Sequence, residues 1–158
     1  MPHEPVSTPL PLPDDPGMLA WRMFLTAHST VIRQLEAELE EHEALALSDF
    51  DVLVQLHLAG GTLRMRDLAE SVLLSRSGMT RRVDRLEAAG YVSRVACETD
   101  RRGSMASLTD IGRERLEHAL PVHVQGITEH FLAPFGAEEL AIIRSTLAKL
   151  VPPDQRPG

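Results

Sequence analysis

The fold is decided by residues 74–87, which read LSRSGMTRRVDRLE. A helix turns by about 100° per residue, and at that angle Met79, Val83 and Leu86 fall on one side. Apolar side chains on one side and polar ones elsewhere predict an amphipathic helix whose apolar side faces the core. Gly90 follows soon afterwards and is expected to end this helix.

The opposite side of this predicted helix is rich in arginine. Ser77, Arg81 and Arg85 follow one another at four-residue steps, so they lie along one line on the outer surface. The start of the helix carries the positive end of the helix dipole and free N–H groups, which suit a phosphate oxygen. An arginine can donate two parallel hydrogen bonds to guanine or clamp a phosphate. The outer side therefore has the chemistry expected of a helix that enters a groove of DNA.

The neighbouring segments place this helix in a larger motif. Residues 65–72 predict a short helix, and residues 73–75 form a tight turn before the arginine-rich helix, which together indicate a helix-turn-helix. Residues 91–96 and 105–108 predict two short strands that flank an Asp-Arg-Arg-Gly turn at residues 100–103. A hairpin beside a helix-turn-helix is a wing, and an arginine at its tip suits a narrow minor groove.

We expect the DNA contacts to come from the arginine-rich helix and from the hairpin tip. These candidates are Ser75, Arg76, Ser77, Thr80, Arg81, Arg82, Arg85, Asp100, Arg101 and Arg102. Asp100 is included because its carboxylate can hold an arginine of the tip in place. Two alternatives stay open. The helix face is simply solvated, with its arginines paired to Asp84 and Glu87, or the tip is an ordinary turn built from Asp and Gly.

The charge of the chain is unevenly distributed. The 158 residues fit one domain, and the net charge of -7 argues against indiscriminate coating of nucleic acid. Residues 64–102 nevertheless hold nine arginines against six acidic residues, whereas residues 34–51 hold seven acidic residues and no lysine or arginine. The arginine-rich stretch is therefore locally positive, and local potential decides contact with DNA.

Several classes of protein are not favoured by this sequence. A phosphate-binding glycine loop, a nucleophile elbow and paired catalytic carboxylates do not stand out, so we expect no enzyme and no cofactor. We expect no metal site, because His118, His123 and His130 are spaced at steps that do not share one helix face. The single Cys97, either a redox switch or an ordinary thiol, suits a reducing cytosol. No apolar run is long enough for a membrane span, and we expect a cytoplasmic protein.

The rest of the chain predicts further helices. Residues 1–15 are proline-rich and indicate a disordered tail, and a first helix follows over residues 17–42, capped by an acid before Pro16. Ser48 is expected to cap a second helix that ends at Gly60 and Gly61. A long helix begins at residues 109–110, is bent by Pro121 and breaks at residues 134–136, and a last helix covers residues 137–150.

This order of elements resembles the MarR family of winged-helix bacterial transcription regulators. Residues 45–53 look like the start of the family's second helix, and residues 75–92 look like its recognition helix and first wing strand. Residues 100–112 look like its wing motif, an Asp-x-Arg turn followed by Leu-Thr-x-x-Gly. The chain departs from the family at Arg82, where an apolar residue is more usual, and in its proline-rich tail. Arg82 lies at the edge of the core face, where it adds either a phosphate contact or a salt bridge.

The resemblance implies a homodimer whose first, fifth and sixth helices intertwine and whose two heads bind a palindrome. It also implies an effector pocket between the dimer helices and the DNA-binding lobe, often for phenolic or lipophilic molecules. The candidates for that pocket are Trp21, Phe24, His28, His57 and Met65, each of which is otherwise a core residue. Apolar stripes on the terminal helices independently favour a dimer, with a compact monomer as the alternative.

The expected fold is mainly α with a small β-hairpin wing. We expect a tail over residues 1–15, a dimerisation helix over 16–44, a winged helix-turn-helix head over 45–109, dimerisation helices over 110–151 and a tail over 152–158. The expected function is sequence-specific DNA binding by a ligand-responsive homodimeric repressor on a palindromic operator. The alternative is a winged-helix protein-interaction module that does not bind DNA, and a salt titration of DNA affinity separates the two.

Overall fold

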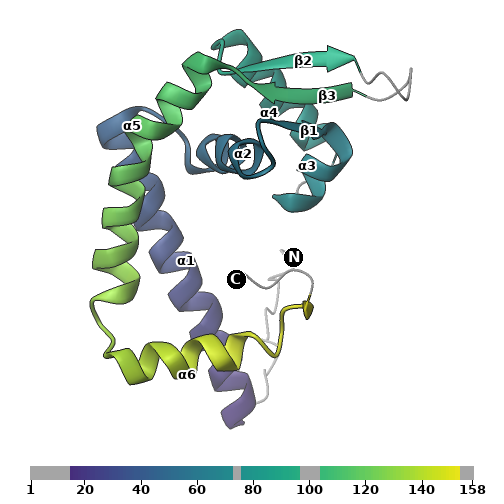
Figure 1. Ribbon diagram of the computed structural model, residues 1–158. Coiled ribbons are helices and arrows are strands. Elements are labelled where there is room, and N and C mark those ends of the chain that lie inside the picture. The colour runs from purple at the N-terminus through teal and green to yellow at the C-terminus, as the bar shows by residue number, and fades with distance from the viewer. Residues whose placement is uncertain (1–14, 73–75, 97–103, 154–158) are drawn as a thin grey trace, which may run out of the picture.

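The computed structural model describes residues 15–72, 76–96 and 104–153. In chain order the elements are α1 (Pro16–Glu43), α2 (Leu47–Leu58), β1 (Thr62–Arg64), α3 (Met65–Ser71), α4 (Arg76–Ala88), β2 (Val92–Ala96), β3 (Ser104–Leu108), α5 (Asp110–Ile127), the π-helical segment η1 (Thr128–Leu132) and α6 (Ala137–Leu147). The elements from α2 to β3 form a head at one end of the molecule, and α1 and α5 run side by side away from it (Figure 1). The predicted fold class is confirmed, whereas the predicted domain boundaries stay a prediction.

The hydrophobic core lies in the head and is centred on α2 and α4. Phe50 and Leu53 of α2 are buried, and so are Met79, Val83 and Leu86 of α4. The apolar side predicted for the arginine-rich helix is therefore the side that packs inward. Burial of this stripe fixes the rotation of α4, and the polar side consequently faces outward.

The helix ends follow the sequence with one exception. Asp15 caps α1 by accepting a hydrogen bond from the backbone N–H of Gly17 at 2.8 Å, with Pro16 in the first turn, as predicted. The prediction that Ser48 caps α2 is wrong. Ala46 is the capping residue, and Ser48 lies inside the first turn, where its hydroxyl accepts a hydrogen bond from Arg82 instead.

The wing belongs to a three-stranded antiparallel sheet of order β1-β3-β2. The predicted hairpin is formed by β2 and β3, in which Arg94 is opposite Ala106, while the predicted tip lies outside the described residues. Strand β1 was not predicted. It pairs Leu63 with Ala106 and follows Gly60 and Gly61, which both have positive φ. Three residues are too few for strand alternation to show in a sequence.

The start of α5 lies directly against the turn between α4 and β2. Thr109 caps α5, and its hydroxyl also donates a hydrogen bond to the carbonyl of Gly90 at 2.7 Å. A Cβ on Gly112 would lie 2.0 Å from the carbonyl oxygen of Tyr91, so only glycine fits there. The Leu-Thr-x-x-Gly motif therefore builds a close backbone contact between the wing and α5.

The helices outside the head leave many large apolar side chains exposed. Only Leu35 and Leu39 of α1 are buried, and no residue of α6 is buried. The exposed large apolar residues of α1, α5, η1 and α6 are Leu19, Trp21, Met23, Phe24, Leu25, Ile111, Leu120, Val124, Phe131, Leu132 and Ile142. Among the described residues, no helix is long and apolar enough to cross a membrane.

Candidate nucleic-acid interface

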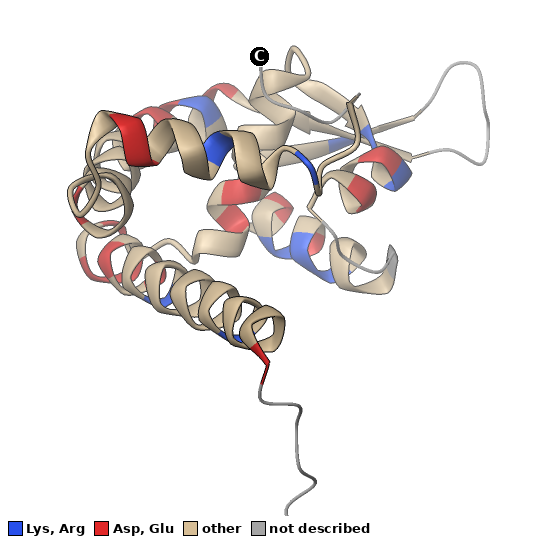
Figure 2. Cartoon of the chain, turned by 90° about the horizontal axis from the view of Figure 1, so that it is seen from below, with Lys and Arg blue, Asp and Glu red and all other residues tan. Residues whose placement is uncertain are grey.

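Helix α4 presents its predicted polar face to solvent. Ser77, Thr80, Arg81 and Arg85 are all exposed. No residue in the described part of the chain pairs with Arg81, so its guanidinium is available to a ligand. Figure 2 shows the basic stretches along α4 and the acidic residues of α1 gathered in the C-terminal half of that helix. Positive charge on the outer surface of a helix is what contact with DNA phosphates requires.

Two other arginines of α4 bind an acidic residue of α2. Asp49 Oδ1 lies 3.2 Å from Arg82 Nη1 and 2.7 Å from Arg85 Nη2. The Arg82 side chain is 19% exposed and that of Arg85 is 61% exposed. The hydrogen bond to Asp49 and the charge of that carboxylate raise the pKa of Arg85. Of the two roles open to Arg82, the structure shows the salt bridge, which joins α4 to α2.

The acidic residues of α4 are paired with the wing and not with the arginines of α4. Arg94 of β2 lies 2.6 Å from Asp84 and 2.9 Å from Glu87, and its backbone N–H also donates to Glu87. Pairing of the α4 arginines with these two carboxylates, the alternative drawn from sequence, is therefore not what the structure shows. The same contacts attach the hairpin to α4 and offset negative charge on the face that carries Arg81.

The two residues that organise this face, Asp49 and Arg94, are not among those predicted from the sequence. The sequence around each of these two residues does not indicate its role, because the ion-pair partners belong to a different helix or strand. Some predicted contacts have no described position: Ser75, Asp100, Arg101 and Arg102 lie outside the described residues, and Arg76 is placed only as the first residue of α4.

The effector candidates are divided between two regions. Phe24 and His28 line a pocket of about 520 Å³ formed by α1, η1 and α6. Trp21 lies beside this pocket, with its ring centroid 6.0 Å from that of Phe24. His57 and Met65 are in the head and do not line the pocket; the His57 ring nitrogen Nδ1 lies 3.3 Å from Arg113.

Comparison with known proteins identifies the family. The model of the MarR family matches residues 45–103. The regulator PecS of Dickeya dadantii is 31% identical over 67% of this chain, and the match spans 64% of PecS, slightly less than two thirds. AbsC, a MarR family transcriptional regulator of Streptomyces coelicolor, is 32% identical with a TM-score of 0.81, and the match covers 89% of this chain and 95% of AbsC. The chain belongs to the MarR family.

Another MarR-family neighbour has been solved with DNA. Sco3205 of Streptomyces coelicolor, in complex with DNA, is 30% identical with a TM-score of 0.76 over 89% of this chain and 94% of that one. This MarR-family protein is a helix-turn-helix transcriptional regulator, as predicted, and PecS, AbsC and Sco3205 are transcriptional regulators as well. The departure at Arg82 is explained by its bond to Asp49.

Proposed function

We propose that this MarR-family protein is a cytoplasmic repressor that binds a palindromic operator as a homodimer. Helix α4 of each copy enters the major groove, and the hairpin tip at residues 100–103 contacts the adjacent minor groove. The observation that carries the proposal is the outer face of α4. Arg81 is exposed there without a described partner, and Arg94 pairs with both carboxylates of the helix. The structure of Sco3205 in complex with DNA supports DNA binding by this chain.

The exposed apolar helices support the homodimer. Trp21 of α1, Val124 of α5 and Ile142 of α6 are each more than half exposed in the single chain. Large apolar side chains along three neighbouring helices indicate a surface that another protein covers. A second copy satisfies this requirement for both chains at once, because a two-fold interface pairs the same surface with itself. The two α4 helices would then lie about 34 Å apart, one turn of DNA.

The pocket between α1 and α6 supports a response to a small lipophilic or phenolic molecule. Its lining is apolar except for His28 and Thr146, and His28 offers a ring nitrogen to a hydroxyl group. An effector bound there would act by favouring one spacing of the two heads over another. A molecule with equal affinity for both arrangements would not change DNA binding.

The decisive experiment has two steps. The purified protein first selects the fragments that it binds from random DNA, and its affinity for a selected fragment is then measured at a series of salt concentrations. Arg81→Ala is expected to weaken binding to the selected fragment by about 5- to 150-fold, which corresponds to about 1–3 kcal/mol for a base contact. Arg144→Ala, an exposed arginine of α6, is the matched control and should leave affinity unchanged. If Arg81→Ala lowers the affinity for every DNA sequence equally, Arg81 contacts a phosphate and not a base. A chain that binds no duplex even at low salt would instead be the protein-interaction module.

The wing is tested separately with Arg102→Ala. Operator binding is expected to weaken while the melting temperature stays nearly unchanged, because the sequence predicts that Arg102 lies in a hairpin turn and contacts DNA. Wild-type affinity in this variant would remove the hairpin tip from the proposed interface.

A further inference from the structure

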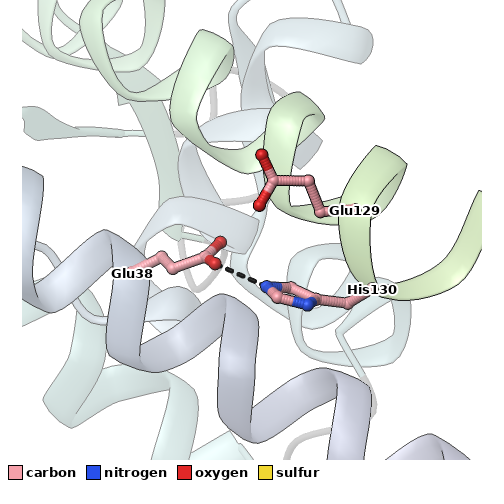
Figure 3. A group of neighbouring side chains, drawn as sticks. All are labelled: Glu38, Glu129 and His130. Atoms are coloured by element: carbon pink, nitrogen blue, oxygen red, sulfur yellow. Dashed lines mark hydrogen bonds and ion pairs between the residues drawn. The ribbon is translucent and has the colours of Figure 1, made fainter. Parts of the chain in front are cut away.

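Three potential metal ligands meet where the end of α5 crosses α1. Glu38 comes from α1, and Glu129 and His130 come from η1 (Figure 3). One ligand atom from each lies within 4.8 Å of the others, and Glu38 Oε1 is 2.5 Å from His130 Nε2. Sequence analysis expected no metal site because it compared histidines along one helix. The acidic partner of His130 is supplied instead by a helix 92 residues away in the sequence.

The surrounding backbone leaves room for these side chains. A Cβ on Gly126 would lie 2.3 Å from Glu38 Oε2, so the absence of a side chain lets the Glu38 carboxylate lie against α5. Glu129 and His130 are consecutive residues of a π-helical turn, a wider turn that is frequent at functional sites. In this turn both side chains are directed toward α1, as Figure 3 shows.

A pocket of about 300 Å³ opens beside the cluster. It is lined by Glu38 and Glu129 and also by His42, which lies one helical turn beyond Glu38 on α1. Residues four apart on a helix share one face, so His42 lies on the same side of α1 as Glu38, although its ring nitrogens are not among the ligand atoms that lie within 4.8 Å of one another. Gln125 donates a hydrogen bond to Glu129 Oε1 at 2.8 Å, the kind of outer contact that orients a ligating carboxylate.

We propose that Glu38, Glu129 and His130 bind a divalent transition-metal ion, with Zn²⁺ as the best fit and His42 as a fourth ligand. Zn²⁺ takes nitrogen and carboxylate oxygen ligands at about 2.0–2.2 Å, so two ligand atoms of a tetrahedral site lie about 3.4 Å apart. Glu38 and His130 would separate by about 1 Å from their direct contact, and Glu129 would move inward by a similar amount. Imidazole in the ligand set disfavours Mg²⁺ and Ca²⁺, which prefer oxygen.

Binding would strengthen the contact between α1 and the π-helical segment from which α6 departs. The π-helical turn leads into α6, which has no buried residue of its own. An ion bridging Glu38 to Glu129 and His130 fixes the end of α5 against α1, and therefore fixes the point from which α6 departs. The proposal concerns the ion alone and does not depend on DNA binding.

The test is a titration of the untagged, metal-free full chain with Co²⁺, followed by displacement with Zn²⁺. Co²⁺ reports its coordination by visible absorbance, and a melting curve with and without Zn²⁺ reports stabilisation. Glu129→Gln is the critical variant, because this exposed side chain bonds only Gln125 among the described residues, so the fold should be kept. The control is Glu117→Gln, an exposed carboxylate of α5 outside the cluster.

We expect one Zn²⁺ per chain, a higher melting temperature with Zn²⁺, and at least about tenfold weaker binding in Glu129→Gln. The Glu117→Gln protein should behave as wild type. His130→Gln should also remove the Zn²⁺-dependent rise in melting temperature, whatever its effect on the metal-free protein, and His118→Gln should retain it. Wild-type Zn²⁺ affinity in Glu129→Gln, or Mg²⁺ binding as tight as Zn²⁺ binding, would overturn the proposal.

Discussion

The contact between α2 and α4 predicts a large effect of Asp49→Asn on stability. The substitution keeps one oxygen acceptor and removes the charge. Hydrogen bonds to charged groups contribute about 1.5–3 kcal/mol and neutral ones about 0.5–1.5 kcal/mol, so each fully buried bond would lose about 1–1.5 kcal/mol. The contact of Asp49 with Arg85 is shorter, at 2.7 Å, but the Arg85 side chain is 61% exposed. Solvent therefore weakens this ion pair, and its loss should lower the free energy of unfolding by about 0.5 kcal/mol or less. The Arg82 side chain is only 19% exposed, so its bond should lose most of that ~1–1.5 kcal/mol, and the expected total for both bonds is about 1–2 kcal/mol.

The assay is urea unfolding followed by circular dichroism, at one protein concentration because assembly contributes to apparent stability. A double-mutant cycle divides the effect between the two arginines. The coupling of Asp49→Asn with Arg82→Gln should be about 1–1.5 kcal/mol, and that with Arg85→Gln about 0.5 kcal/mol or less. The reasoning is refuted if the Arg85 coupling equals or exceeds the Arg82 coupling, since exposure would then not determine which pair stabilises the head.

Three further predictions come from the head and α5. Arg94→Gln should weaken DNA binding in a fluorescence anisotropy titration, because two carboxylates on the DNA-facing helix lose their partner; unchanged affinity would contradict this role. Gly112→Ala should lower the free energy of unfolding by about 2 kcal/mol, although alanine favours helices, because its Cβ would meet a backbone oxygen at 2.0 Å. Gly136→Ala, where the Cβ has space, should cost only the smaller loss of a favourable N-cap residue, about 1 kcal/mol or less, and a loss equal to that of Gly112→Ala would refute the steric argument. Burial lowers the pKa of His123 below its usual 6.5, so the folded state disfavours the charged ring and stability falls as the pH drops from about 7.5 to 5.5. His123→Gln should reduce the dependence of the free energy of unfolding on pH, and the control His118→Gln should leave it unchanged. If the dependence in His123→Gln is as steep as in the wild type and the control, His123 does not contribute.

The parts of the fold that sequence predicted are those governed by local periodicity and capping. Met79, Val83 and Leu86 are spaced for one helix face, and burial of that face determines where Arg81 points. Asp15 before Pro16 marks the start of α1, because both residues act on the first turn only. The candidate DNA-contacting face of α4 was therefore predictable from fourteen consecutive residues.

The parts that sequence did not predict depend on contacts between distant segments. Ser48 has the chemistry of a cap, but the nearby guanidinium of Arg82 is a better partner for its hydroxyl. The role of Arg94 depends on the packing of β2 against α4, which the local sequence does not indicate. The cluster that contains Glu38 and His130 cannot be found by inspecting one helix, because Glu38 belongs to α1 and His130 belongs to the π-helical segment η1.

The close approach of Gly112 to the Tyr91 carbonyl has a mechanical consequence. Where main chain touches main chain, no side chain can flex to absorb a displacement. A tilt of α5 is thus expected to displace the turn that leads into β2. We therefore expect the start of β2 and the first turn of α5 to move together, so that a signal which rotates this long helix also displaces β2.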